Sequence, residues 1–347
     1  MASVAASPGP SPPPAVPVPR ERVSSWPLID RVCYWLCWIT GIGLCVIAVA
    51  IVVFMFVKGI AYLRPELFVK SPAASLRQTQ SGGFLDPIIG TFVVTAIGTA
   101  VAAPLGIALG VWLSEYRSPR WLARIVGSSI EILAGVPSIV LALFGLLIVS
   151  KGFLSFLSQG SPQGALGESF LDAGLFMALL AMPLIVAATY EALEQVPDRV
   201  REASWALGKT RATTIRHVLL PSIRPSMAGG VVLGMGRIIG DTAIVTVLLG
   251  LTLKNEPVGS TPIIGTLRGT GSTLTSYIFY NSPAGEGNSH EKAYAAAFVL
   301  LMVVLALNAL VTRITRGREP GSRSWWSGFL TRARLVGGGS TSGGPEP

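Results

Sequence analysis

Two residues of opposite charge, Arg237 and Asp241, lie in a stretch of sequence that is otherwise apolar. The uncharged segment AGGVVLGMG precedes them, and AIVTVLLGLTL follows. A charged side chain at the centre of a bilayer costs about 2.5–3.5 kcal/mol on insertion scales, so such residues commonly mark a transport pathway. Because they are four residues apart, the two side chains would share one helix face and could neutralise each other. The pattern favours a pathway, and a structural ion pair between helices is the alternative.

The length of the apolar segments sets the class of protein. Hydrophobic residues make up 50% of the 347 residues and charged residues 13%, about half the charged fraction of a soluble domain. A helix needs about 20 mostly apolar residues to cross a membrane. We therefore predict an all-α, polytopic membrane protein with six transmembrane helices, at residues 33–57, 88–113, 125–149, 170–190, 226–253 and 293–314. A third charge in these segments, Glu131, could face a pathway or pair with Arg237.

The basic residues indicate how these helices are oriented. The formal net charge is +9, and most lysines and arginines fall in the two termini, the second loop and the fourth loop. Because loops rich in Lys and Arg stay in the cytoplasm, both termini and the fourth loop are predicted to be cytoplasmic. Membrane orientation thus accounts for the basic charge, and nucleic acid is not expected as a partner.

Three regions are predicted along the chain. Residues 1–27, rich in Pro, Ala and Ser, should form a disordered cytoplasmic tail. Residues 28–317 should form the six-helix domain, and residues 318–347 a flexible cytoplasmic tail. The cysteines lie in or beside the first helix and the histidines are far apart, so neither set has the pattern of a metal site and no metal is expected.

The fourth loop, residues 191–225, is patterned like a docking segment. Asp198 could cap a short helix that ends at Gly208, where a left-handed conformation would suit glycine. A second amphipathic turn should follow, until Pro221 breaks it. Two short helices joined by a bend at the membrane surface would suit insertion into a groove of another protein.

Part of this loop, ASWALGKT, ends like a phosphate-binding P-loop. That motif needs a glycine five residues before Gly208, where this chain has Ala203, and it needs a preceding strand. We therefore expect no nucleotide on this chain. If transport uses ATP, a separate subunit must bind it.

The same loop resembles the EAA signature of ABC importer permeases, which is E-A-A, three residues, G, nine residues and I-x-L-P. Here Glu202-Ala203-Ser204 and Gly208 are followed at that spacing by the segment VLLP. The resemblance implies a type I ABC importer permease fold and a coupling helix that sits in a cleft of an ATPase subunit. The residues assigned to this contact are Glu202, Ala203, Ser204, Gly208, Leu220 and Pro221.

Three further segments resemble the permeases of Pst-type phosphate importers, PstA and PstC. They are RIIGDTA at 237–243, similar to R-x-x-G-E-T-A, then PLGIALGVWLSEY at 104–116 and AGVPSIVLALFG at 134–145. The closing helix is more like that of PstA. This chain departs from the pattern at Asp241, where the family has Glu, and at Ala187, where several PstA sequences have Arg.

The resemblance implies half of a phosphate pathway, lined by Arg237, Asp241, Thr242 and Glu131. Arg237 could give the anion two charge-assisted hydrogen bonds. Asp241 could accept a proton from a protonated phosphate, which sulfate could not offer. The implied partners are a second, PstC-like permease, two PstB-like ATPase subunits and a PstS-like phosphate-binding protein outside a bacterial cytoplasmic membrane. ATP and Mg would be bound by the ATPase, with no cofactor on this chain.

Two alternatives are open from the sequence. Within the same class, the chain could be the PstC-type sister subunit or a permease for another oxyanion, such as molybdate or sulfate. In a different class, it could be a membrane enzyme acting on lipid phosphates. Such an enzyme would need acidic or histidine residues clustered at a helix end, and the sequence shows no such cluster.

Overall fold

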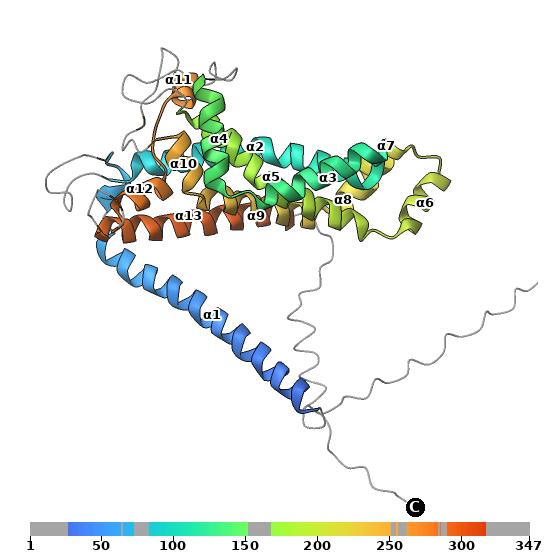
Figure 1. Ribbon diagram of the computed structural model, residues 1–347, viewed down its shortest axis with the longest axis horizontal. Coiled ribbons are helices and arrows are strands. Elements are labelled where there is room, and N and C mark those ends of the chain that lie inside the picture. The colour runs from blue at the N-terminus through green and yellow to red at the C-terminus, as the bar shows by residue number, and fades with distance from the viewer. Residues whose placement is uncertain are drawn as a thin grey trace, which may run out of the picture. The chain divides into compact units, whose positions relative to one another are not determined.

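Helices make up the regular structure of this chain (Figure 1). The computed structural model describes residues 27–63, 65–72, 83–151, 168–250, 255, 262–283, 285 and 290–316. No β-strand occurs within these ranges, which confirms the predicted all-α class. Apart from residue 27, the two predicted tails lie outside the described residues.

Within the described ranges, four helices are long and apolar enough to cross a membrane by themselves. They are α1 (Leu28–Tyr62), α2 (Leu85–Val111), α5 (Phe170–Glu194) and α13 (His290–Arg316). They cover the first, second, fourth and sixth predicted spans. Two bent helix pairs raise the number of candidate spans to six if each pair counts as one span.

The chain divides into two compact units, Met1–Phe54 and Met55–Pro347. In the first, the described residues belong to α1, and their apolar side chains, such as Ile39 and Leu44, are exposed. The second unit contains every other element. Its shorter elements are η2 (Pro65–Phe68), η3 (Trp112–Tyr116), α3 (Arg120–Gly135), α4 (Ser138–Lys151), α6 (Asp198–Ala206), α7 (Arg211–Thr214), η4 (Ile215–Leu219), α8 (Leu220–Ser222), α9 (Arg224–Gly240), α10 (Ala243–Leu248), α11 (Pro262–Arg268) and α12 (Leu274–Asn281).

The third predicted span, residues 125–149, is not one straight helix. It consists of α3 and α4, which meet at an angle of 108°. Val136 between them is extended, with φ −70° and ψ 129°, because the ring of Pro137 disfavours a helical conformation in the residue before it. Pro137 then starts α4, since its carbonyl accepts the first hydrogen bonds from Val140 and Leu141. The predicted span is therefore present as a sharply bent helix pair.

The fifth predicted span, residues 226–253, is also interrupted. Helix α9 ends at Gly240, and Asp241 is extended, with φ −79° and ψ 126°, before α10 begins. The 17 residues of α9 rise about 26 Å at 1.5 Å per residue, slightly less than the ~30 Å hydrocarbon core. The interruption therefore falls at the end of α9 that is remote from the loop of residues 191–225, and the last predicted residues, 251–253, lie outside the described ranges.

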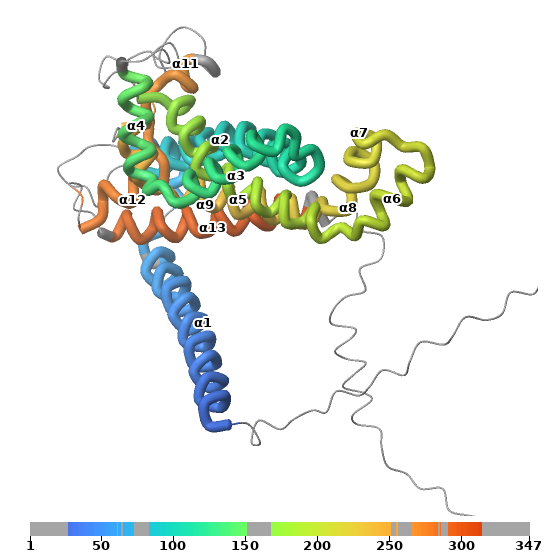
Figure 2. Tube along the Cα trace, turned by 45° about the vertical axis from the view of Figure 1, so that its right-hand side comes forward, coloured from blue at the N-terminus to red at the C-terminus, as the bar shows by residue number. Residues whose placement is uncertain are grey.

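Helix α5 is the centre of the second unit, where α2 packs along one side of it and α9 along another (Figures 1 and 2). Glycines permit both approaches. A Cβ on Gly106 would lie 2.9 Å from Ile185 of α5, and a Cβ on Gly230 of α9 would lie 2.6 Å from Ala188. The three helices therefore pack tightly around a core that includes Met177.

Helix α12 packs against α13 and α2. The rings of Tyr277 and Phe84 meet edge to face, with their centroids 5.4 Å apart. Burial raises the pKa of Tyr277 to about 12. The backbone N–H of Leu274 donates to the hydroxyl of Thr91 on α2 at 2.9 Å. These contacts join the segment before α13 to the start of α2.

Candidate functional site: the interrupted helix and the cytoplasmic loop

The interruption after Gly240 fixes the position of Asp241. Its carboxylate oxygen Oδ1 accepts a hydrogen bond from the backbone N–H of Ile244 at 2.9 Å, which supplies a partner for one of the free N–H groups at the start of α10. Thr242 follows, and its carbonyl accepts both the N–H and the hydroxyl of Thr246. Asp241 and Thr242 are half-buried. The carboxylate of Asp241 and the first turn of α10 therefore lie at the point where the helix is interrupted.

Arg237 lies on the exposed face of α9, one turn before the interruption. Thirteen residues separate it from Arg224 at the start of α9, which corresponds to about 20 Å along the helix. On the same helix, Gly236 and Gly240 have no atom within 4 Å of where a Cβ would lie, whereas Ile238 is buried. One side of α9 is therefore covered by this chain, and the side with Arg237 is open.

Arg237 and Asp241 do not pair in this structure. Among the described residues, no hydrogen bond or ion pair within 4.0 Å joins the Arg237 guanidinium to another side chain. The expectation of a shared helix face fails because Asp241 has left the helix, and Oδ1 is directed to the backbone of α10. Arg237 is thus available to an anion or to another chain.

Glu131 lies in a groove between α3 and α5. The groove has a volume of about 520 Å³, and its lining includes Glu131, Ala187, Tyr190 and Glu191. Glu131 makes no ion pair with Arg237 within the described part of the chain, so the structure does not bring these two predicted pathway residues together. Ala187, the position of the second departure from the Pst pattern, contributes only a methyl group to this groove.

The fourth loop, residues 191–225, forms the helix, bend and helix that its sequence predicts, with two local differences. Gly208 has φ +75°, the left-handed conformation expected at the bend. Asp198 does not cap α6 but contacts Arg201, and Pro197 precedes the helix instead. Pro221 does not break the second helix, which continues through Ser222 and bends by 71° before α9. A π-helical turn, η4, precedes Pro221, which lacks the N–H that a regular α-helix needs there.

Residues of the predicted coupling signature occupy two different environments. Glu202 and Ala203 are exposed on α6, as are Trp205 and Leu207, which is 79% exposed. Ser204 is buried, and its hydroxyl lies 2.8 Å from the hydroxyl of Thr214 on α7. One face of α6 therefore offers acidic and apolar side chains to solvent, while the opposite face holds α6 against α7.

The second half of the loop packs on the end of α5. Its buried apolar cluster consists of Ala192, Leu193, Ile215, Leu219 and Ile223, with Leu220 half-buried against it. Leu193 and Leu219 are fully buried. Because this cluster is continuous with α8 and α9, the loop is an integral part of the helical body.

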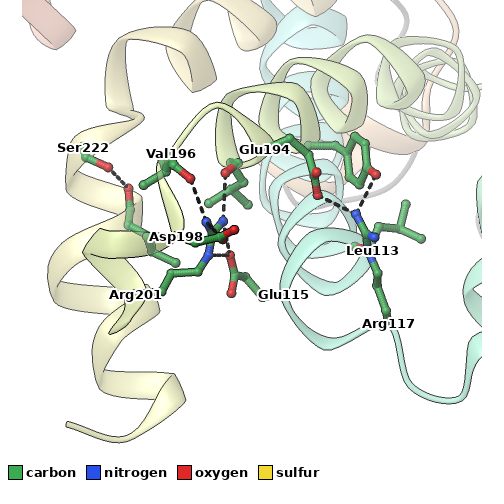
Figure 3. A network of polar contacts seen from close by, with 11 residues as sticks. Leu113, Glu115, Arg117, Glu194, Val196, Asp198, Arg201 and Ser222 are labelled. Atoms are coloured by element: carbon green, nitrogen blue, oxygen red, sulfur yellow. Dashed lines mark hydrogen bonds and ion pairs between the residues drawn. The ribbon is translucent and has the colours of Figure 1, made fainter. Parts of the chain in front are cut away.

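A polar network that the sequence analysis did not identify ties α6 to the body (Figure 3). Nε and Nη2 of Arg201 donate to Oε1 of Glu115 on η3 at 3.1 and 2.9 Å, and the two side chains are only 13% and 6% exposed. Nearby, Arg117 donates to Glu194 and, at 2.8 Å, to the hydroxyl of Tyr190. Residues 115 and 201 are 86 positions apart, so no local spacing indicated that they meet.

The chain has the fold of the type I ABC importer permeases. In three dimensions the chain is similar to a chain of a crystal structure of a bacterial ABC transporter involved in the import of the acidic polysaccharide alginate. The TM-score is 0.54 at 16% identity, and the match covers 82% of this chain and 96% of that chain. The likeness establishes the fold.

Residues 102–323 match the family of the binding-protein-dependent transport system inner membrane component. The chain belongs to this family and is therefore a multi-pass inner membrane permease component of an ABC importer.

Two relatives refine the comparison. The phosphate transport system permease protein PstA 1 of Mycobacterium tuberculosis (strain ATCC 25618 / H37Rv) is 31% identical over 256 residues, covering 73% of this chain and 76% of the relative. The protein PstC of Xylella fastidiosa (strain 9a5c) is 31% identical over 240 residues, covering 64% and 69%. Resemblance to Pst-type permeases is thus confirmed. Equal identity to a PstA and a PstC protein does not distinguish between the two subunits.

Proposed function

We propose that this chain is the permease subunit of an ATP-driven importer of inorganic phosphate and forms half of the translocation pathway. The observation that supports this most directly is the exposed guanidinium of Arg237 on α9, which has no ion-pair partner among the described residues. A charge placed about 20 Å along a membrane helix needs a partner, and here a passing anion would supply it. The names of the relatives favour phosphate as that anion.

The proposed binding site is completed by Asp241 and Thr242. Arg237 would bind two phosphate oxygens in a forked arrangement. With Oδ1 of Asp241 held by the N–H of Ile244, Oδ2 has no partner among the described residues and could accept a hydrogen bond from a protonated phosphate. Sulfate is fully deprotonated and could not donate this bond. Glu131 would line the pathway elsewhere, in the groove between α3 and α5.

Two exposed surfaces of the chain would serve two of the proposed partners. A second, PstC-like permease would cover the open face of α9, where Gly236 and Gly240 leave room for close helix packing. Two PstB-like ATPase subunits would bind ATP and Mg, one of them docking on the exposed face of α6 around Glu202 and Leu207. A PstS-like protein would deliver phosphate from outside. Both termini would be cytoplasmic, on the side of the loop.

Transport would proceed by alternating access. ATP binding would draw the loops of the two permeases together, and the helical bodies would tilt so that the pathway opens to the other side. This chain would contribute no nucleotide site, and no metal or other cofactor of its own.

Uptake of radiolabelled phosphate tests this proposal in cells that lack other phosphate importers and express the complete transporter. We expect uptake that an excess of unlabelled phosphate abolishes and an excess of sulfate or molybdate does not. Labelled sulfate and molybdate, assayed in parallel, should not accumulate. Efficient uptake of either one in place of phosphate would assign the chain to another oxyanion.

A further inference from the structure

One guanidinium, that of Arg201, connects three elements at the cytoplasmic end of the second unit. It belongs to α6, where Nη1 contacts Asp198 at 3.2 Å. It also donates to the carbonyl oxygen of Leu193 in the last turn of α5, from Nη2 at 2.9 Å, and to that of Val196 just after α5, from Nη1 at 2.7 Å. Nε and Nη2 reach Glu115 on η3, directly after α2. Figure 3 shows these contacts converging on a single side chain.

Burial makes this contact costlier to break than a surface ion pair. Exposed pairs contribute about 0–1 kcal/mol, partly because water and salt screen them. Arg201 and Glu115 are largely buried, so breaking the pair leaves a poorly solvated charge. The planar fork of arginine also allows contacts in several directions, which the single ammonium of lysine would not reproduce.

The elements that Arg201 connects lead to the proposed pathway. Glu115 continues from α2, which packs on α5 where Gly110 approaches Thr189. On its other side α5 contacts α9, which bears Arg237. A displacement of α6 would therefore be passed through buried, tightly packed contacts to α9. The second connection runs along the chain itself from α7 to α9, but it includes the 71° bend.

We propose that the Arg201–Glu115 pair is the link by which movement of the coupling helix α6 is passed to α2 and α5, and so to the pathway on α9. This inference rests on the proposed function, because it takes α6 as the ATPase contact. Arg201 and Glu115 are positioning residues, which would touch neither phosphate nor nucleotide.

A matched pair of residues provides the control. Arg117 and Glu194 also form an Arg–Glu contact, but it joins the segment after η3 to α5 and does not include α6, and its side chains are about half exposed (50% and 47%). Loss of this contact should leave the link between α6 and the body in place. Arg117→Gln is therefore the control for Glu115→Gln and Arg201→Gln.

The readout is the reactivity of one thiol in the purified complex of this chain with its permease and ATPase partners. The three cysteines, all on α1, would be replaced by alanine, and Gly240→Cys would report from the open face of α9, where a Cβ meets nothing within 4 Å. Labelling rates would be compared in the absence of nucleotide and after addition of ATP and vanadate, which traps ADP and vanadate in the ATPase after hydrolysis. This readout needs no phosphate.

We expect trapping to change the labelling rate at position 240 in the parent and in Arg117→Gln. Glu115→Gln and Arg201→Gln should retain the ATPase subunit and trap nucleotide, yet lose most of that change. The charge exchange Glu115→Arg with Arg201→Glu should recover part of it. A full change in labelling rate in both single variants would overturn the proposal. Loss of the ATPase subunit from the single variants that the charge exchange does not restore would also overturn it, because the pair would then be needed for assembly alone.

Two further outcomes separate this proposal from the assigned substrate. A parent complex whose position 240 does not respond to ATP would overturn the link, because the link ends at α9. A parent that responds to ATP and shows the expected variant pattern, but takes up another anion, would retain the link and overturn phosphate import.

Discussion

The hydroxyl oxygens of Ser204 and Thr214 lie 2.8 Å apart, in a buried hydrogen bond that joins α6 to α7 across the bend of the cytoplasmic loop. The EAA signature has alanine where this chain has Ser204. The substitution adds a hydroxyl in a buried position, and Thr214 supplies its partner. Thr214 also donates to the carbonyl of Thr210 at 3.1 Å, so the two hydroxyls do not depend on the contact equally.

This asymmetry predicts different effects of removing either hydroxyl. Ser204→Ala should cost about 1 kcal/mol or less, because the Thr214 hydroxyl retains its bond to Thr210. Thr214→Val should cost about 1–3 kcal/mol, because it leaves the Ser204 hydroxyl buried without this partner. The midpoint of thermal unfolding in detergent measures both. Equal midpoints for the two variants would contradict the inferred direction of these hydrogen bonds.

Gly208 should tolerate asparagine better than alanine or valine. With φ +75° it occupies the left-handed region, which costs other residues about 1–2 kcal/mol and asparagine less. Since no atom lies within 4 Å of a Cβ there, backbone strain and not crowding would cause the effect. We expect Gly208→Val to weaken ATPase retention and uncouple ATP hydrolysis from uptake, with Gly208→Asn close to the parent. Normal coupling in Gly208→Val would contradict this role of the bend.

Arg237 should not tolerate substitution, even by lysine. Arg237→Ala and Arg237→Lys should each lose most phosphate uptake while the protein still inserts and retains its ATPase, because lysine lacks the two-pronged contact. Arg313→Lys, at an exposed arginine on α13, is the control and should transport normally. Uptake is normalised to membrane abundance by blot. If Arg237→Ala takes up phosphate at the parental rate, Arg237 has only a structural role, and Glu131 becomes the next candidate for the pathway.

Three substitutions of Asp241 should distinguish its role in capping α10 from its proposed role in transport. Asp241→Asn can still accept the N–H of Ile244, so it should fold normally but lose uptake or change its pH dependence, since an amide takes up no proton. Asp241→Glu keeps the carboxylate and should be the mildest change for uptake. Asp241→Ala removes the cap and should also lower stability, by about 1 kcal/mol. Uptake at several pH values, together with thermal unfolding, distinguishes these effects, and an unaltered pH profile in Asp241→Asn would exclude a proton-accepting role.

Topology is testable with introduced cysteines in the cysteine-free background. A cysteine at Ser282, after α12, should react with an impermeant thiol reagent added to intact cells. One at position 318 should react only after the membrane is made permeable. The opposite pattern would place α6 outside the cell and remove the basis for its contact with an ATPase.

The sequence by itself determined those features that depend on neighbouring residues. Apolar length was sufficient to place α1, α2, α5 and α13, because a membrane helix satisfies its own backbone hydrogen bonds. Likewise, Gly208 marked the bend of the loop, since glycine alone adopts a left-handed conformation without strain. Residues 125–149 were recognisable as one apolar segment, but the angle of 108° between α3 and α4 was not predictable from the sequence.

Tertiary structure decided which distant side chains meet and which remain open. Helical spacing predicted that Arg237 and Asp241 would pair, but the helix ends at Gly240, and Asp241 bonds instead to the backbone of α10. Glu115 and Arg201 are each unremarkable in sequence, and they meet because α2 packs along α5 and brings η3 to the start of α6. Periodicity describes one helix at a time, whereas a buried ion pair between separate helices depends on how those helices pack.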